Sequence, residues 1–76
     1  MTTQLHQQVG RRLLAIRQEK KVSQEALADS IGMHRSYIGA LERGERNPSL
    51  RVIYNVAERL GVSTDYLLCS HGEQHT

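Results

Sequence analysis

Glycine spacing is the feature that most limits how this chain can fold. Gly32, Gly44 and Gly61 each follow directly on a short segment in which apolar residues recur every three or four positions. Such spacing is typical of an amphipathic helix, and a glycine after it supplies the left-handed residue that most other residues resist. The chain is therefore predicted to fold as a series of short helices.

Serines mark where three of these helices begin. Ser23, Ser49 and Ser63 each precede a helical pattern, and a serine side chain in that position accepts a hydrogen bond from the first turn. No strand pattern, internal repeat or long linker interrupts the series. The predicted helices cover residues 5–20, lie between Ser23 and Gly32, between His34 and Gly44 and between Ser49 and Gly61, and cover residues 64–68.

The core that such a chain can build is small. It has 76 residues and neither Phe nor Trp, so its core must rest mainly on Leu, Ile and Val. A core of that size usually contributes only a few kcal/mol of net stability, and oligomerisation is one common remedy. We expect one domain over residues 1–70 and a flexible polar tail over residues 71–76.

The overall charge of the chain does not by itself identify a partner. Ten Lys and Arg oppose eight Asp and Glu, and the resulting net charge of +2 allows a local basic face. The N-terminus has no apolar region typical of a signal peptide, and no run approaches the ~18 apolar residues of a membrane span. We therefore expect a cytoplasmic protein, in which Cys69 simply packs, with a redox role as the alternative.

The residue pattern also argues against catalysis and against bound metal. There is no glycine-rich phosphate loop and no paired carboxylate pattern, so we do not expect an enzyme. His71 and His75 are four residues apart, as two metal ligands on a helix can be, but the polar tail offers no further ligand. We expect no metal, no cofactor and no small-molecule ligand.

The segment 24–44 contains the pair of helices that points to function. Ala28 is small enough to let the two helices approach closely, and Gly32 makes the turn between them. The residues expected to tie the pair to the core are Leu27, Ile31, Ile38 and Leu41. The second helix is left with an outer face that is neither acidic nor apolar, which is predicted to carry Arg35, Ser36, Gly39, Ala40 and Arg43.

An outer face of this kind suits the major groove of DNA, which is about 12 Å wide and admits one α-helix. The guanidinium of Arg35 matches O6 and N7 of guanine, the hydroxyl of Ser36 can donate or accept, and Ala40 can touch a thymine methyl. Side chains beside the groove, and the free N–H groups at a helix start, suit phosphate oxygens. The residues expected there are Ser23, Gln24, Arg43, Arg46, Asn47 and His34, the last with a capping role as its alternative.

Three stretches, SQEALADSIG, RSYIGALERGERNPSL and LGVSTDYLL, occur together at a distinctive spacing. In this combination the chain resembles the Cro/repressor-type (XRE-like) helix-turn-helix family of bacterial and phage transcriptional regulators, over residues 9–68. Within that family, HRSYIGALERGERNPSL looks most like the controller proteins of restriction–modification systems. The resemblance implies a compact five-helix bundle of the phage-repressor DNA-binding type with a central helix-turn-helix.

The resemblance also implies which residues contact DNA. It matches Arg35, Ser36 and Ala40 to base-reading positions. It adds Tyr37 to the contacts with phosphate or the groove wall, with packing as an equal alternative. The other residues that it matches to phosphate or groove-wall positions are Gln24, Arg43, Arg46 and Asn47.

Further roles follow from the same resemblance. Arg17 and Glu42 match an ion pair beneath the second helix, against the alternative of two separate exposed charges. Glu25 and Asp29 match an acidic pair that contacts RNA polymerase in some phage repressors, although such a pair is most often a solvated helix face. The residues that match a dimer interface are Val52, Tyr54, Thr64 and Leu67.

The chain departs from the family pattern at two positions. Lys21 stands where glycine is usual after the first helix, so this lysine is either left-handed, with a strain of roughly 1 kcal/mol, or belongs to a different turn. Ala40 is a weak reader of bases, so specificity is expected to rest heavily on Arg35.

The function expected from these residues is sequence-specific DNA binding by a homodimer on inverted-repeat operators. Autoregulation and control of a restriction–modification system follow from the resemblance, with a plain phage-type or antitoxin-type repressor as the alternative. A helix-turn-helix module that binds a protein is the alternative from another class. Protein interfaces favour aromatic and aliphatic anchors, and Tyr37 is the only such anchor near the outer face.

Overall fold

The computed structural model describes residues 2–68, with side chains from residue 6 onward. This part of the chain contains no strand, and its helices are α1 (Thr2–Glu19), α2 (Gln24–Ser30), α3 (Arg35–Glu42), α4 (Leu50–Leu60) and α5 (Thr64–Leu68). The prediction of an all-α chain with five helices is thus confirmed. Cys69, His71 and His75 lie outside the described residues.

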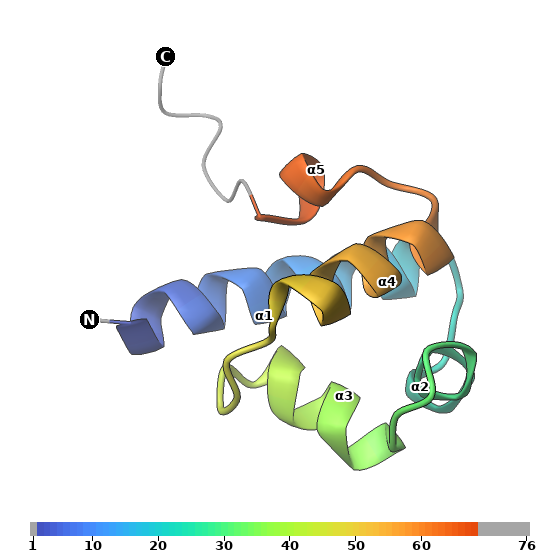
Figure 1. Cartoon of the computed structure of the whole chain (residues 1–76), viewed down its shortest axis with the longest axis horizontal. Coiled ribbons are helices and arrows are strands. Elements are labelled where there is room, and N and C mark those ends of the chain that lie inside the picture. The colour runs from blue at the N-terminus through green and yellow to red at the C-terminus, as the bar shows by residue number, and fades with distance from the viewer. Residues whose placement is uncertain (1, 69–76) are drawn as a thin grey trace.

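The helices are arranged around one core (Figure 1). In that view α2 and α3 lie at one end of the molecule and α5 at the opposite end, with α1 and α4 between them. The first helix begins at Thr2 rather than at residue 5, because residues 2–4 are polar and add nothing to the apolar pattern. The buried apolar residues are Val9, Leu13, Ile16, Leu27, Ala28, Ile38, Leu41, Ile53, Val56, Ala57, Leu60 and Leu67.

Short-range signals set the ends of these helices as predicted. The hydroxyl oxygens of three serines accept a hydrogen bond from a backbone N–H three residues further on, which satisfies one of the free donors of a first turn. These bonds join Ser23 to Ala26 over 2.9 Å, Ser49 to Val52 over 3.2 Å and Ser63 to Tyr66 over 3.0 Å. The glycines that follow the helices are left-handed, with φ of 74° at Gly32, 76° at Gly44 and 74° at Gly61.

The turn between α1 and α2 shows which of the two alternatives holds for Lys21. Its φ is 60°, so the lysine occupies the left-handed conformation that glycine adopts more easily. The backbone N–H of Lys21 donates to the carbonyl of Gln18 over 3.1 Å, and that of Val22 donates to Arg17 over 3.0 Å. The turn therefore keeps the geometry expected for glycine, at a strain of about 1 kcal/mol.

The contacts that attach the last helix to the rest include a buried leucine and a cation–π interaction. Leu67 of α5 is buried in the core with 1% of its surface exposed. Beside it, the guanidinium carbon of Arg12 lies 5.3 Å from the centre of the Tyr66 ring, within the range of a cation–π interaction. These contacts join α5 to α1 and to the core under α4.

The closest approach between α1 and α3 occurs at Gly10. A Cβ atom at this position would lie 2.2 Å from the carbonyl oxygen of Leu41 and 2.7 Å from that of Glu42. Glycine in a helix is unfavourable by roughly 0.5–1 kcal/mol relative to alanine. The absence of a Cβ at Gly10 lets the last carbonyl groups of α3 pack directly against α1.

We expect Gly10→Ala to lower the free energy of unfolding by about 1–3 kcal/mol, because the added methyl group meets backbone rather than a mobile side chain. Gly39→Ala is the matched control, since a Cβ in this second helical glycine would first meet the end of the Arg43 side chain at 3.2 Å. It should leave stability unchanged or raise it by up to about 1 kcal/mol. Urea denaturation followed by circular dichroism measures both, and equal stabilisation by both alanines would contradict the close approach.

Candidate nucleic-acid interface

The turn between α2 and α3 determines how α3 is presented. Gly32 takes the left-handed conformation, and the backbone N–H of Met33 donates to the carbonyl of Ala28 over 2.9 Å. Ala28 is buried in the contact with α3, and Leu27 and Ile38 are completely buried in the same core. A tight turn and a small residue thus pack the two helices closely, with α3 at one end of the molecule (Figure 1).

The outer side of α3 is polar and carries small side chains. Ser36 and Arg43 are exposed there, with Ala40 half-buried between them. Arg35 is exposed in the first turn of the helix. This arrangement leaves a shallow surface along α3, bordered by arginines, that an edge of a base pair can approach.

Gly39, which was predicted on that outer face, is covered there by other side chains of the protein. It is buried at the edge that faces α2. A Cβ on it would lie 3.2 Å from Nη1 of Arg43 and 3.6 Å from Nε2 of Gln24, so both side chains extend across it. The glycine therefore makes room for two protein side chains rather than for a base.

An ion pair lies beneath α3. Nε of Arg17 is 2.6 Å from Oε2 of Glu42, and Nη2 of the same arginine donates to Oε1 over 3.1 Å. Only 11% of the arginine side chain and 5% of the glutamate side chain are exposed. Nη1 of Arg17 donates to the carbonyl of Val22 over 2.9 Å. The two residues thus form one buried pair, not two separate exposed charges.

Gln24 extends this network from the start of α2. Its Nε2 donates to Oε1 of Glu42 over 2.9 Å, so one of its amide hydrogens points inward. The groups left for the predicted phosphate contact are the second amide hydrogen of Gln24 and the free N–H groups in the first turn of α2. Ser23, which caps this turn, is exposed.

The predicted phosphate residues after α3 fall into two differently held groups. Arg43 donates from Nε to Oε2 of Glu45 over 2.9 Å and from Nη2 to Oε1 over 3.1 Å, and both side chains are more than half exposed. This hydrogen bond and charge hold the pKa of Glu45 below its ordinary value and raise the pKa of Arg43. In contrast, the guanidinium carbon of Arg46 lies 5.3 Å from the centre of the Tyr37 ring, and no carboxylate of residues 6–68 forms an ion pair with it.

Tyr37 combines the two alternatives considered for it. It is half-buried and packs against the core cluster, and its ring lies under Arg46. His34 occupies the position before the first turn of α3, but its side chain makes no capping hydrogen bond. It is exposed, as is Asn47 in the loop that follows α3.

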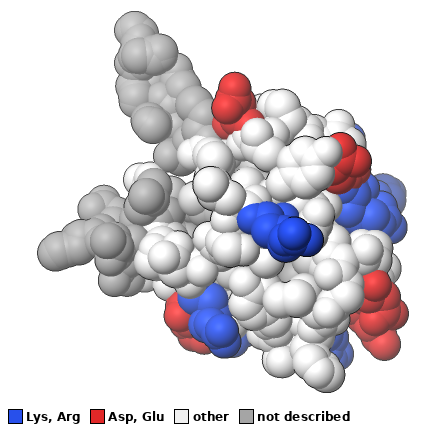
Figure 2. Space-filling view, viewed as in Figure 1, with Lys and Arg blue, Asp and Glu red and all other residues white. Residues whose placement is uncertain are grey.

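Charges of both signs are mixed on the face of the molecule that Figure 2 presents. Figure 2 shows cationic and anionic side chains scattered among neutral ones over the visible surface. Glu25 and Asp29 are exposed on α2, four residues apart. On α2 the exposed charges are therefore acidic, so the attraction for a polyanion falls to the exposed arginines at α3 and in the loop after it, Arg35, Arg43 and Arg46.

The residues predicted for a dimer interface are not equally accessible. Tyr54 is exposed on α4, and a hydrogen bond with Glu58 raises its pKa, whereas Val52 and Thr64 are half-buried. Leu67 has to be removed from the set, because its side chain is buried in the core of its own chain. Leu50 is 80% exposed, because it starts α4 beyond the edge of the core.

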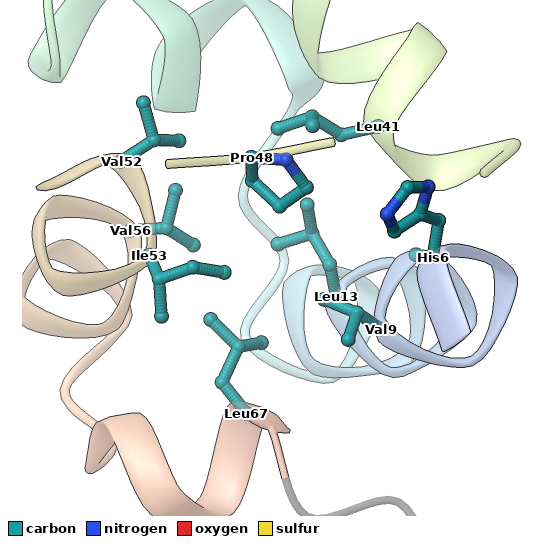
Figure 3. A pocket seen from close by; sticks show the side chains of 10 residues that line it. His6, Val9, Leu13, Leu41, Pro48, Val52, Ile53, Val56 and Leu67 are labelled. Atoms are coloured by element: carbon teal, nitrogen blue, oxygen red, sulfur yellow. The ribbon is translucent and has the colours of Figure 1, made fainter. Parts of the chain in front are cut away.

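No site for a cofactor emerges from the described part of the chain. Residues 2–68 contain no group of three or more His, Cys, Asp or Glu side chains placed to hold a metal ion, and none of their helices is long and apolar enough to cross a membrane. Figure 3 shows a pocket between α1, α4 and α5 into which Leu13, Val56 and Leu67 point. Its volume of about 10 Å³ corresponds to a single water molecule, so this pocket is too small for an effector.

The chain is similar to known proteins over most of its length. Residues 13–67 match the family model described as Helix-turn-helix. Control protein C.BamHI of Bacillus amyloliquefaciens is 41% identical over 69 residues, which make up 90% of this chain and 85% of that protein. The immunity repressor protein of Bacillus phage phi105 is 40% identical over 60 residues, but these are only 42% of the phage protein's length and 79% of this chain.

A solved structure extends the likeness to three dimensions. The restriction-modification controller protein C.AhdI from Aeromonas hydrophila is 42% identical and has a TM-score of 0.79, covering 82% of this chain and 94% of that one. The family match begins within α1 and ends within α5, so it includes the α2–α3 pair and the core around it.

Glu42→Ala should lower the free energy of unfolding by about 3–5 kcal/mol, because it leaves the guanidinium of Arg17 buried without its partner. Replacing both charges in Arg17→Met/Glu42→Leu should recover most of that loss. Glu45→Ala is the control, since it breaks an exposed arginine–glutamate pair and should barely move the denaturation midpoint. Urea titrations of the three variants decide this, and similar losses from both single alanines would show that burial of the pair is unimportant.

Proposed function

This chain belongs to the helix-turn-helix family of DNA-binding transcriptional regulators, and on that premise we propose that it acts as a homodimer on inverted-repeat operators, one of them at its own gene. It is a regulator rather than an enzyme. Its place of action is the cytoplasm, at the nucleoid. No small effector is needed, because the amount of the protein itself is a sufficient control variable.

The outer side of α3 is the observation that carries this proposal. It presents Arg35 and Ser36, with the small Ala40 behind them, and neither polar side chain makes a hydrogen bond within the described part of the chain. With α3 in the major groove, Arg35 donates to O6 and N7 of a guanine, and Ser36 contacts a neighbouring base. Ala40 lets the helix approach closely and meets a thymine methyl group.

Phosphate contacts then position the helix on both sides of the groove. Arg46 is held over the ring of Tyr37, which leaves its N–H groups directed outward for a phosphate. The first turn of α2 offers free backbone N–H groups to a second phosphate. The full set of proposed phosphate contacts is Ser23, Gln24, His34, Tyr37, Arg43, Arg46 and Asn47.

A dimer is supported by apolar side chains on the far side of the loop that follows α3. Leu50 and Tyr54 are four residues apart on α4, so they share one face of it, and both are mostly exposed. Leu50 and Tyr54 thus offer an apolar surface for a second copy, and the half-buried Val52 and Thr64 complete the proposed set of dimer contacts from other sides of α4 and α5. Two recognition helices about 34 Å apart, or a multiple of that distance, match successive turns of B-DNA and hence an inverted repeat.

The likeness to control protein C.BamHI and to the restriction-modification controller C.AhdI supports a more specific role. We propose that the chain governs a restriction–modification system, activating at one occupancy and repressing at another. The exposed carboxylates of Glu25 and Asp29 on α2 are the proposed contact with RNA polymerase. Repression alone, as in the phage-type relative, is the alternative within this class.

Selection from a random-sequence duplex pool, followed by binding to DNA from upstream of the protein's own gene, tests the proposal. We expect the selected duplexes to share an inverted repeat that also occurs in the upstream DNA. Selection of single half-sites would contradict the dimer, and absence of the repeat from the upstream DNA would contradict autoregulation. If no duplex is enriched and a protein partner binds instead, the helix-turn-helix serves protein recognition.

Arg35→Ala should weaken binding to the selected duplex by about 1–3 kcal/mol and relax the preference at one base pair in each half-site. Arg46→Ala is its counterpart and should weaken binding to all sequences alike, with a salt dependence reduced by about one charge. Fluorescence anisotropy with matched and base-substituted duplexes at several salt concentrations separates the two. Equal losses from Arg35→Ala on selected and random DNA would remove Arg35 from base reading.

A further inference from the structure

Glu45 is an exposed carboxylate in the middle of the surface that we propose to face phosphates. It follows Arg43 and Gly44 and precedes Arg46 and Asn47 in the loop after α3. A carboxylate repels the phosphates of DNA, so its presence among residues that attract them requires an explanation. The structure shows that its two oxygens are both occupied by Arg43, at 2.9 and 3.1 Å.

The pair with Glu45 changes what Arg43 presents to DNA. Nε and Nη2 of Arg43 donate to the carboxylate, and Nη1 lies 3.2 Å from the place that a Cβ of Gly39 would take. Two of the three guanidinium nitrogens are thus engaged by Glu45, and the paired charges cancel at a distance. Arg46 differs, because an aromatic ring holds it by its face and leaves its charge uncompensated.

We propose that Glu45 masks Arg43 and so determines specificity, with Arg43 reaching a phosphate only where the operator fits α3 closely. This inference rests on the proposed docking of α3 in the major groove. On unrelated DNA, where the helix sits loosely, the pair stays closed and Arg46 supplies the attraction. On the operator, a phosphate held at hydrogen-bond distance replaces the carboxylate as the partner of Arg43.

The strength of the pair suits such a switch. An ion pair with both side chains more than half exposed is weak, so a well-placed phosphate can open it. The hydrogen bond from Arg43 lowers the pKa of Glu45, so the carboxylate stays charged, and the pair intact, at neutral pH. The gain in specificity is correspondingly limited, at about two- to fivefold.

The test compares binding of the full-length protein to two duplexes, the tightest one from the selection and one of random sequence, over a range of salt concentrations. Glu45→Gln should raise the affinity for random DNA by about two- to fivefold and steepen its salt dependence by about one charge, with a smaller gain on the selected duplex. Glu19→Gln removes the same charge from the exposed end of α1 and should change neither slope.

The double variant Arg43→Gln/Glu45→Gln keeps the net charge of the wild type and gives the decisive comparison. Masking predicts wild-type affinity and salt slope on random DNA, together with weaker binding to the selected duplex. Equal weakening on both duplexes would overturn the proposal, because it would mean that Arg43 contacts phosphate everywhere. Failure of the wild type to bind any duplex would instead overturn the proposed DNA docking, and unchanged denaturation midpoints show that the variants fold.

Discussion

The carboxylate of Glu42 lies beneath α3, and a charge at that depth is stable only with partners. Those partners come from Arg17 of α1, which also holds the carbonyl of Val22 in the next turn, and from Gln24 of α2. The carboxylate of Glu42 therefore links three helices at the C-terminal end of α3. The orientation of that outer side depends on this network, because none of the short helices is long enough to be stable alone.

Backbone packing supports the same point from α1. Gly10 and Arg17 are seven residues apart and therefore share one face of α1. The glycine admits the carbonyl oxygens of Leu41 and Glu42, and the arginine binds the carboxylate of Glu42. The end of α3 is thus held through its backbone and through its side chain by one helix, and the strained turn at Lys21 directly follows that helix.

Features that depend on neighbouring residues could be predicted from the sequence, and features that depend on distant ones could not. The serine caps, the glycine ends and the left-handed Lys21 are set within one turn of chain, and the structure has all of them. The covering of Gly39 could not be predicted, because one of the side chains that cover it comes from another helix. The burial of Leu67 in its own chain could not be predicted either, because its match to a dimer interface does not give the extent of the core.

The same limit applies to the candidate interface. Arg35 and Ser36 could be assigned an outward direction because α3 is short and regular and its inner face is apolar. The partners of Arg43 and Arg46 could not be predicted, because they depend on how the loop 43–49 folds back over α3. Two arginines that look equivalent in the sequence are consequently held by a carboxylate in one case and by an aromatic ring in the other.

The shortness of α5 determines how this part of the protein opens. A helix of five residues has no stability of its own, so its amide hydrogens exchange through detachment from the core rather than through unfolding of the whole chain. When Leu67 leaves, water enters the pocket that Leu13, Ile53 and Val56 share with it (Figure 3). Because this opening is local, α5 is expected to lose its hydrogen-exchange protection before the other described helices, while the pairs that hold α3 stay intact.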